Sequence, residues 1–271
     1  MAEKFLHREG APFSEKVWEK IDETVVAAAK SRLAGRRLIQ IQGPYGLGLK
    51  ALSSGDKPVD EKTAGNAKMT AGCVTPLVII KSGFALPVRD IAAFEQCDLP
   101  LDLGDAAKAA IDCAQQEDNL IFNGSKTIGL KGVMNIDGSQ SVKLKQWDDV
   151  GTAADDIIRA VTTLDKAGFH GPYALGLSNE LYNLLFRRYP QGNQTELEHI
   201  RQIITDGIVK ASAIPSGGIL LCTCGPFASI VLGQDLMTGF IGPSNNEYEF
   251  AVFESVALKL IEPASICILK K

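Results

Sequence analysis

The pattern of apolar and polar positions predicts a long central helix over residues 105–122. This stretch contains no proline or glycine, and its alanines are strong helix formers. Asp105 is the expected N-cap. Glu117 and Asp118 lie near the C-terminal end, where the helix dipole disfavours acidic side chains, and the simplest interpretation is a solvent-exposed tip. By their three- and four-residue spacing, the residues expected to face a neighbouring element are Ala106, Ala110, Cys113 and Leu120.

A second amphipathic helix is predicted after Ser14, with Gly35 as its stop. The strand that follows, over residues 38–42, alternates strictly, so Ile39 and Ile41 should share one face. The apolar positions of the helix, which recur every four residues, are Val17, Ile21, Val25 and Ala29.

Residues 47–76 show little periodicity and form too long a segment for an ordinary compact connection. An arm, a lid or disorder is expected there. The apolar and β-branched run 77–86 predicts a returning strand, so residues 38–86 resemble a two-stranded excursion. Because a two-stranded ribbon is marginally stable in water, we expect it to pack on another chain.

The second half of the chain predicts a compact α/β unit, followed by strands that return to the first part. The helices are expected at 152–167 and 179–188, and the strands of the unit at 172–177, 208–213, 218–223 and 228–232. The returning strands are expected at 248–253, 257–261 and 266–269.

Composition and charge argue against nucleic-acid binding, membrane insertion and secretion. The net charge of −4 offers no basic surface for nucleic acid. The longest apolar runs fall far short of the about 20 residues that span a bilayer, and the N-terminus lacks the apolar core of a signal peptide. We therefore expect a cytoplasmic chain without nucleic-acid or membrane partners.

Candidate chemistry is sparse. The three histidines, at 7, 170 and 199, do not have zinc-hydrolase spacing, and Cys222 and Cys224 lack a second ligand pair, so we interpret the two cysteines as core residues. Phosphate-binding and nucleophile-elbow motifs are missing. Asp155 and Asp156 are expected to complement a helix start. No catalytic residue, metal or cofactor is predicted, so the chain is not expected to be an enzyme.

Several motifs stand in a fixed order: FLHREGAPFSEKVWEKID, AGRRLIQIQGPYG, AQQEDNLIFNG with GLKG, HGPYALGLS and LGQDL. This ordered set resembles the encapsulin shell proteins, family 1 type, nearly end to end. Encapsulins are related to the major capsid proteins of tailed phages. The resemblance therefore implies an α+β chain with the tailed-phage major capsid (Hong Kong type) fold.

In that fold the chain would divide into five segments. They are an N-terminal helix and first strand of the peripheral domain (1–41), an extended loop arm (42–79), the peripheral domain with its spine helix (80–131), an axial domain (132–225), and C-terminal strands returning to the peripheral domain (226–271).

The resemblance also implies a function. The chain would form the self-assembling icosahedral shell of a cytoplasmic nanocompartment, and its partners would be further copies of itself and a cargo enzyme. The cargo, a ferritin-like iron oxidase or a dye-decolorizing peroxidase, would enter through a C-terminal targeting peptide. The residues that the resemblance assigns to peptide binding are Leu33, Arg36, Leu38, Gln40, Leu236 and Thr238.

Arg36 would hold peptide carbonyls or a carboxylate. Gln40 departs from the acidic residue expected in relatives, which would weaken contact with a basic cargo residue. The alternative, that residues 33–40 simply join the helix to the sheet, stays open. A pore at the fivefold axis would be lined from loop 189–195 or the segment near 206–207. The tentative pore residues are Gln191, Gly192, Asn193, Asp206 and Gly207, and the uncharged loop predicts weak charge selection.

Two other functions compete with the shell. A phage or prophage major capsid protein would share the fold but would need a scaffold and package DNA, and this mildly acidic chain argues against it. A soluble protease-like enzyme ranks last, because the sequence offers scattered cysteines and separated histidines rather than a nucleophile beside a base.

Overall fold

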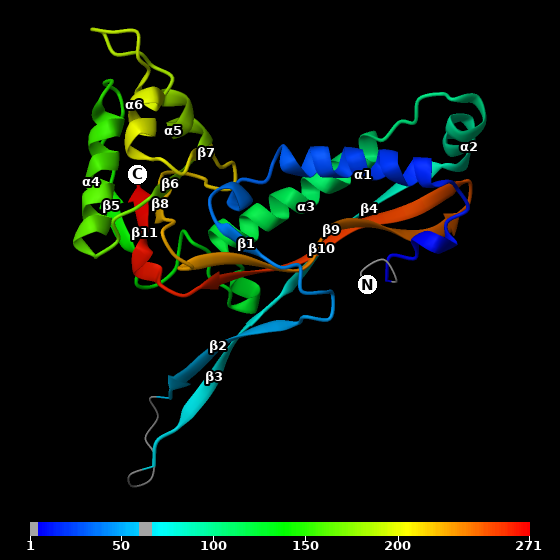
Figure 1. Ribbon diagram of the computed structural model, residues 1–271, viewed down its shortest axis with the longest axis horizontal. Helices are drawn as coiled ribbons and strands as arrows, with labels where there is room; N and C mark the ends of the chain where they lie inside the picture. The colour runs from blue at the N-terminus through cyan, green and yellow to red at the C-terminus, as the bar shows by residue number, and fades with distance from the viewer. Residues whose placement is uncertain (1–4, 60–66) are drawn as a thin grey trace. The chain divides into compact units, whose positions relative to one another are not determined.

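A computed structural model describes residues 5–59 and 67–271 of the chain (Figure 1). It divides into two compact units, each assembled from stretches that are distant in the sequence. The first unit is Met1–Val26, Gly43–Cys113 and Val231–Lys259, and the second is Ala27–Gln42, Ala114–Ile230 and Leu260–Lys271. None of the helices in the described ranges is long and apolar enough to cross a membrane.

A four-stranded sheet has the strand order β1–β9–β10–β4. β4 and β10 run antiparallel, and Phe84 stacks on its partner Phe250 with ring centroids 4.9 Å apart. The predicted strand 77–86 is confirmed as β4, although it pairs with β10 and not with the strand near residue 40. The strands are β1 (Gln40–Gln42), β4 (Val78–Pro87), β9 (Ala228–Ser244) and β10 (Glu247–Leu260).

Both predicted helices of the first half are confirmed, and their ends are corrected. α1 (Glu15–Lys30) ends well before Gly35, which instead begins the 3-10 turn η3 (Gly35–Arg37). α3 (Gly104–Asn123) buries all four residues of its predicted face. At its start the Gly104 N–H donates to the carboxylate of Asp102 at 2.9 Å, so a side chain just ahead of the helix accepts its first N–H, and Asp105 lies inside the first turn.

The packing of these helices explains their apolar faces. Trp18 of α1 meets the Phe250 ring edge-on, and the Cys113 thiol of α3 lies 3.6 Å from the Val252 carbonyl of β10. A shorter helix, α2 (Val88–Cys97), follows β4 directly. The described residues also form three further 3-10 turns, η2 (Arg8–Gly10), η4 (Lys126–Ile128) and η5 (Pro263–Ser265).

The segment expected to be aperiodic contains two strands, β2 (Ala51–Pro58) and β3 (Thr70–Pro76). They form a separate antiparallel hairpin whose register shifts between Ser53 and Asp56, and Gly55 between them has a φ of +83°. This bulge interrupts the two-residue alternation by which a strand is recognised in a sequence. The predicted loose tip, residues 60–66, lies outside the described residues.

The alternation expected for Ile39 and Ile41 is wrong. Leu38 still has helical backbone angles at the end of η3, so the strand starts only at Gln40. Ile39 is consequently buried in the turn, whereas Ile41 is 41% exposed on β1.

The second unit contains a five-stranded sheet in the order β5–β11–β8–β6–β7. Its predicted α/β character is confirmed. Its strands are β5 (Gln140–Lys143), β6 (Tyr173–Leu177), β7 (Ile208–Lys210), β8 (Gly218–Cys222) and β11 (Ile266–Lys270). Its helices are α4 (Thr152–Lys166), α5 (Asn179–Leu184) and α6 (Glu196–Ile203).

The strand expected at 228–232 begins β9 of the four-stranded sheet instead, and two further expectations fail in this unit. β11 does not return to the first part of the chain; it lies between β5, which is parallel to it, and β8, which is antiparallel. Its residues 266–269 are all buried, as suits a strand with neighbours on both sides. The five-segment domain division stays a prediction.

The second failure is Asp156, which does not cap a helix. It is completely buried and accepts hydrogen bonds from the Lys145 N–H at 2.7 Å and the Trp147 Nε1–H at 3.0 Å, and it pairs with Arg159. Burial acts to raise the pKa of this carboxyl, but these donors outweigh it and hold the pKa below its usual range.

Candidate functional site

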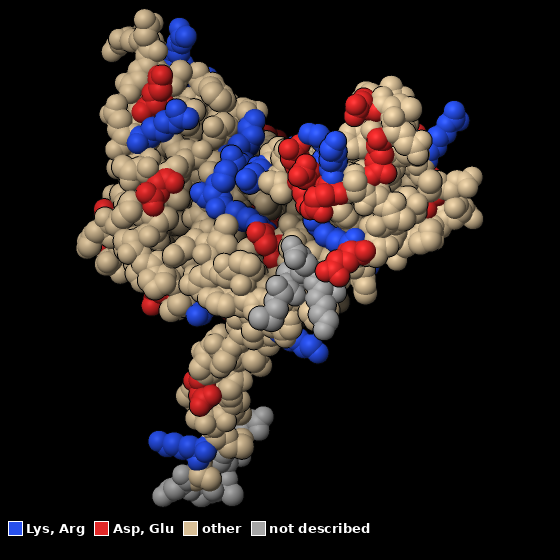
Figure 2. Space-filling model, turned by 45° about the vertical axis from the view of Figure 1, so that its right-hand side comes forward, with Lys and Arg blue, Asp and Glu red and all other residues tan. Residues whose placement is uncertain are grey.

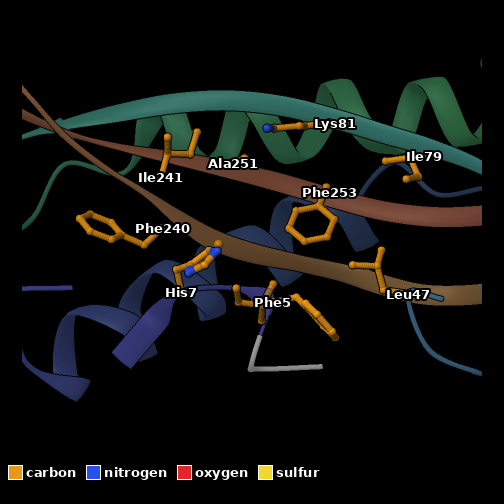
Figure 3. Close-up of a pocket in the computed structure, with 11 residues that line it drawn as sticks. Phe5, His7, Leu47, Ile79, Lys81, Phe240, Ile241, Ala251 and Phe253 are labelled. Carbon is orange, nitrogen blue, oxygen red and sulfur yellow. The ribbon is translucent and has the colours of Figure 1, made fainter. Parts of the chain in front are cut away.

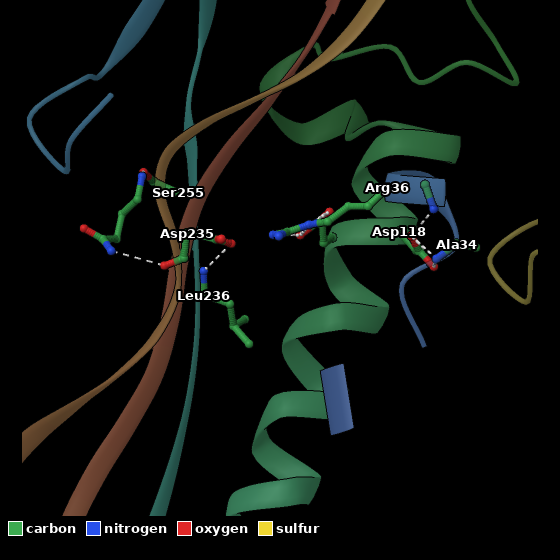
Figure 4. Close-up of polar contacts among 9 residues, drawn as sticks. Ala34, Arg36, Asp118, Asp235, Leu236 and Ser255 are labelled. Atoms are coloured by element: carbon green, nitrogen blue, oxygen red, sulfur yellow. Dashed lines mark hydrogen bonds and ion pairs between the residues drawn. The ribbon is translucent and has the colours of Figure 1, made fainter. Parts of the chain in front are cut away.

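Two acidic residues of α3 bind the turn that joins α1 to β1 (Figure 4). Asp118 is 4% exposed, and its carboxylate accepts the N–H groups of Ala34 and Gly35, each at 2.8 Å. The expected solvent-exposed tip is therefore wrong. We call this contact set, Ala34–Arg36 with Glu117 and Asp118, the α3 clamp.

Glu117 completes the clamp through Arg36. The Arg36 Nε and Nη2 donate to the two carboxylate oxygens at 2.9 and 2.7 Å, and the side chains of Arg36 and Glu117 are only 14% and 0% exposed. Such a two-pronged, charge-assisted pair is strong and geometrically specific. The guanidinium predicted to hold a cargo peptide is thus already engaged by Glu117.

The clamp requires a close approach of the turn to the helix. A Cβ at Gly35 would lie 3.2 Å from Asp118 Oδ1 and 3.3 Å from the Ile121 side chain. A larger residue would press on both groups, so glycine sets the distance at which the two N–H donors reach the carboxylate.

Burial raises the pKa of Asp118 to about 6. The N–H donors of Gly35 and Ala34 oppose this shift, and the charge of Glu117 adds to it. Asp118 is therefore ionised at neutral pH and takes up a proton under mildly acidic conditions.

The other predicted peptide-binding residues of this stretch differ in exposure. Leu33 and Leu38 are buried, and the Leu38 side chain lies against Gly176 of β6, where an added Cβ would come within 2.8 Å of it. Gln40 is exposed on β1. Gln40 is therefore the member of this stretch with a free surface.

Leu236 and Thr238 belong to β9 in the first unit. Leu236 is half-buried, and its N–H donates to the Asp235 carboxylate at 2.8 Å (Figure 4). Thr238 is completely buried, and its carbonyl accepts a hydrogen bond from Arg8 Nε at 2.9 Å. Peptide binding by Leu33, Arg36, Leu38, Gln40, Leu236 and Thr238 stays a prediction.

The predicted pore residues occupy two segments separated by α6. Gln191, Gly192 and Asn193 are exposed in a turn that the Arg188–Thr195 bridge closes. The helix after it begins with a capping box between Thr195 and Glu198. The sequence carries this signal as TELE, although no helix was expected there.

Asp206 and Gly207 lie just before β7. The Asp206 carboxylate accepts from the Thr223 hydroxyl, and its N–H donates to the Tyr173 carbonyl at 3.0 Å. Gly207 has a φ of +115°, a conformation that favours glycine. Placement of these residues and of residues 191–193 on a fivefold axis stays a prediction.

The first unit also holds an apolar cavity of about 400 Å³ (Figure 3). Its lining comes from five separate stretches, so no local pattern indicates it. Among the lining side chains that the structure describes, none carries a carboxylate, hydroxyl or thiol, and the site is suited to binding apolar groups. The lining residues are Phe5, Leu6, His7, Leu47, Ile79, Lys81, Gly239, Phe240, Ile241, Ala251 and Phe253.

Metal chemistry finds no support in the described ranges, where no three histidine, cysteine, aspartate or glutamate residues gather closely enough to hold an ion.

A protein-family model described as "Encapsulating protein for peroxidase" matches residues 3–257. The type 1 encapsulin shell protein EncA of Myxococcus xanthus is 33% identical over 276 residues, covering 98% of this chain and 96% of the relative. The chain belongs to the encapsulin family. Its relatives are named as shell proteins and not as enzymes, in agreement with the sequence-based prediction.

Solved structures confirm the fold class. The virus-like particle of Pyrococcus furiosus superposes with a TM-score of 0.73 at 19% identity, covering 94% of this encapsulin and 99% of that chain. The capsid of Myoviridae phage XM1 superposes with a TM-score of 0.54 at 10% identity, covering 85% and 88%. The chain therefore has the α+β fold of tailed-phage capsid proteins.

The clamp generates a pH-dependence prediction. Asp118 titrates near 3.8 when unfolded and near 6 when folded, so between these values the folded chain binds more protons. Its contribution to the free energy of unfolding should therefore fall as pH rises from about 4 to about 6, and stay level above that. Asp118→Asn should abolish this slope. It should also destabilise the protein by about 1–3 kcal/mol at neutral pH, since an amide NH2 group in place of Oδ2 would face the Ala34 N–H, and two donors cannot bond to each other.

Thermal unfolding measured across this pH range checks both effects. The matched control is Asp112→Asn, at a position on the same helix outside the clamp, which should leave stability and slope nearly unchanged. Identical profiles for Asp118→Asn and wild type would contradict the role of the clamp.

Proposed function

We propose that this encapsulin assembles with copies of itself into a closed icosahedral shell that encloses a cargo enzyme in the cytoplasm. The observation that carries the self-assembly is the hairpin β2–β3. Within the described chain it pairs only with itself, and Val74 on it is 68% exposed. An isolated two-stranded ribbon is marginally stable in water, so a second copy is the natural source of its missing contacts.

Other surfaces of the first unit support the same proposal. Phe5, Ile79 and Ile241 are between 54% and 62% exposed around the apolar cavity. Figure 2 shows few charged side chains along the visible face of the hairpin. Exposed apolar area of this kind is typical of a surface that another protein covers.

We further propose that the cargo is a ferritin-like iron oxidase or a dye-decolorizing peroxidase carrying a C-terminal targeting peptide. The family description, which names encapsulation of a peroxidase, supports the second choice. In this proposal the exposed Gln40 and half-exposed Leu236 contact the peptide, with Arg36. The buried Leu33, Leu38 and Thr238 support the backbone beside them.

The assembly proposal is tested by expressing the chain alone and combining size-exclusion chromatography with negative-stain microscopy. We expect uniform hollow spheres. Val74→Asp should shift most of the protein to small oligomers, because it places a charge at the exposed apolar position of β3, whereas the near-isosteric Val74→Thr should still form spheres. A wild-type monomer or small oligomer would overturn autonomous assembly and favour the scaffold-dependent phage capsid protein.

Cargo binding is tested by charge at Gln40. A fluorescent protein is fused to the C-terminal peptide of the enzyme encoded beside the shell gene and co-expressed with each variant. For a peptide with a basic residue, Gln40→Glu should raise the fluorescence retained per shell several-fold, and Gln40→Lys should lower it, since an exposed ion pair contributes up to about 1 kcal/mol. Equal loading by both variants, with intact shells, would remove Gln40 from the peptide site.

We also propose that the turn at residues 191–193 lines a pore of the shell. This is tested with a lysine pair, Gln191→Lys with Asn193→Lys, and the matching glutamate pair. If the turn lines an opening, the lysine shells should admit small anions faster than wild type and the glutamate shells more slowly. Stopped-flow quenching of an encapsulated dye by iodide measures the entry rate. Three indistinguishable rates would place the opening elsewhere.

A further inference from the structure

The cysteine pair Cys222 and Cys224 has a geometry that the shell function does not use. Their Sγ atoms lie 2.9 Å apart, whereas the four other cysteines, all within the described ranges, make no such contact with a thiol. Cys113 and Cys267 are buried, which raises the pKa of each to about 12 and keeps them as inert thiols. The chain thus holds one vicinal dithiol.

The fold brings these two sulfurs together. β8 ends at Cys222, and the chain bends at Cys224 instead of continuing as a strand. Between them, the Thr223 N–H donates to the Pro172 carbonyl at 2.9 Å, and the Thr223 hydroxyl donates to the Asp206 carboxylate. Because the intervening residue is held through its backbone and its side chain, the two thiols are positioned before any reaction.

The two sulfurs also differ in access. Cys222 is 5% exposed and packs in the core of the second unit, opposite Tyr173 in the strand register. Cys224 is exposed. Solutes can therefore reach the Cys224 thiol but not the Cys222 thiol. Redox-active cysteine pairs often have this arrangement, in which the exposed cysteine attacks the oxidant and its neighbour resolves the product.

We propose that Cys222 and Cys224 are a reversible disulfide modification site, oxidised by hydrogen peroxide and reduced by dithiols. The Cys224 thiolate attacks one peroxide oxygen, breaking the O–O bond and giving a sulfenic acid and hydroxide. The Cys222 thiolate then attacks the sulfenic sulfur, forming the S–S bond and expelling hydroxide. Overall two thiols and one peroxide give one disulfide and two waters.

A disulfide accounts for this pair better than a metal. The two thiolates supply only half of the four ligands that a structural zinc site needs, and the described residues gather no third ligand. The hydrogen bond that the Cys224 thiol donates to Cys222 favours its protonated form and raises its pKa, so the reaction at neutral pH calls for peroxide in excess over protein.

The site is tested on the full chain in a Cys73→Ser, Cys97→Ser background, which leaves the pair and the two buried thiols. After peroxide treatment and quenching, intact mass should fall by two hydrogen atoms, and peptide mapping should join Cys222 to Cys224. Dithiothreitol should restore the mass. Adding Cys224→Ser should abolish the loss, and adding Cys222→Ser should leave a sulfenic acid that dimedone traps.

A second comparison guards against non-specific oxidation. In the wild-type chain, the fraction of Cys222–Cys224 disulfide should exceed the oxidised fraction of the lone exposed Cys97 at every peroxide concentration by at least several-fold. Oxygen addition at Cys224 without a disulfide, or equal oxidation of Cys97, would overturn the proposal.

Discussion

The α3 clamp is the contact on which the connection between α1 and β1 depends. The carboxylates of Glu117 and Asp118 are almost completely removed from water, which costs hydration free energy. This cost is offset because the Ala34 and Gly35 N–H groups and the Arg36 guanidinium lie at hydrogen-bond distance from them. The three donors come from consecutive residues of one turn. The turn cannot shift by even one residue without leaving a buried charge unpaired, so the end of α1, the start of β1 and the second half of α3 have a single mutual arrangement within the second unit.

Sequence patterns correctly predicted the helices and strands that have a regular apolar pattern within their own residues. α1 and α3 have long apolar stripes, and α4 and β4 also lie where periodicity placed them. The failures share a different cause. The β2 strand is interrupted by a bulge at Gly55, and β11 has a pattern that fits either sheet, so its place is decided by β5 and β8, which lie far from it in the sequence. Pairing between distant strands leaves no local trace.

The candidate site shows the same division. The family resemblance pointed to residues 33–40, and the structure shows that contacts with α3 hold this stretch in place. The sequence of α3 alone does not explain why it has two acidic residues, Glu117 and Asp118, near its C-terminal end. A helix dipole disfavours acids near its C-terminal end, and only a turn 84 positions earlier supplies the donors that reverse this preference. The apolar cavity was missed for the equivalent reason, since its walls come from stretches on either side of the hairpin and from β9 and β10.

The position of β11 has a consequence for how the chain is made. The ribosome releases β11 after every other element that the structure describes, yet β5 and β8 both need it as a neighbour. During translation the second unit therefore exists with a missing strand between two open edges, and its sheet can close only after residue 270 has left the exit tunnel. The order of synthesis thus delays completion of this sheet until every other element that the structure describes has been made.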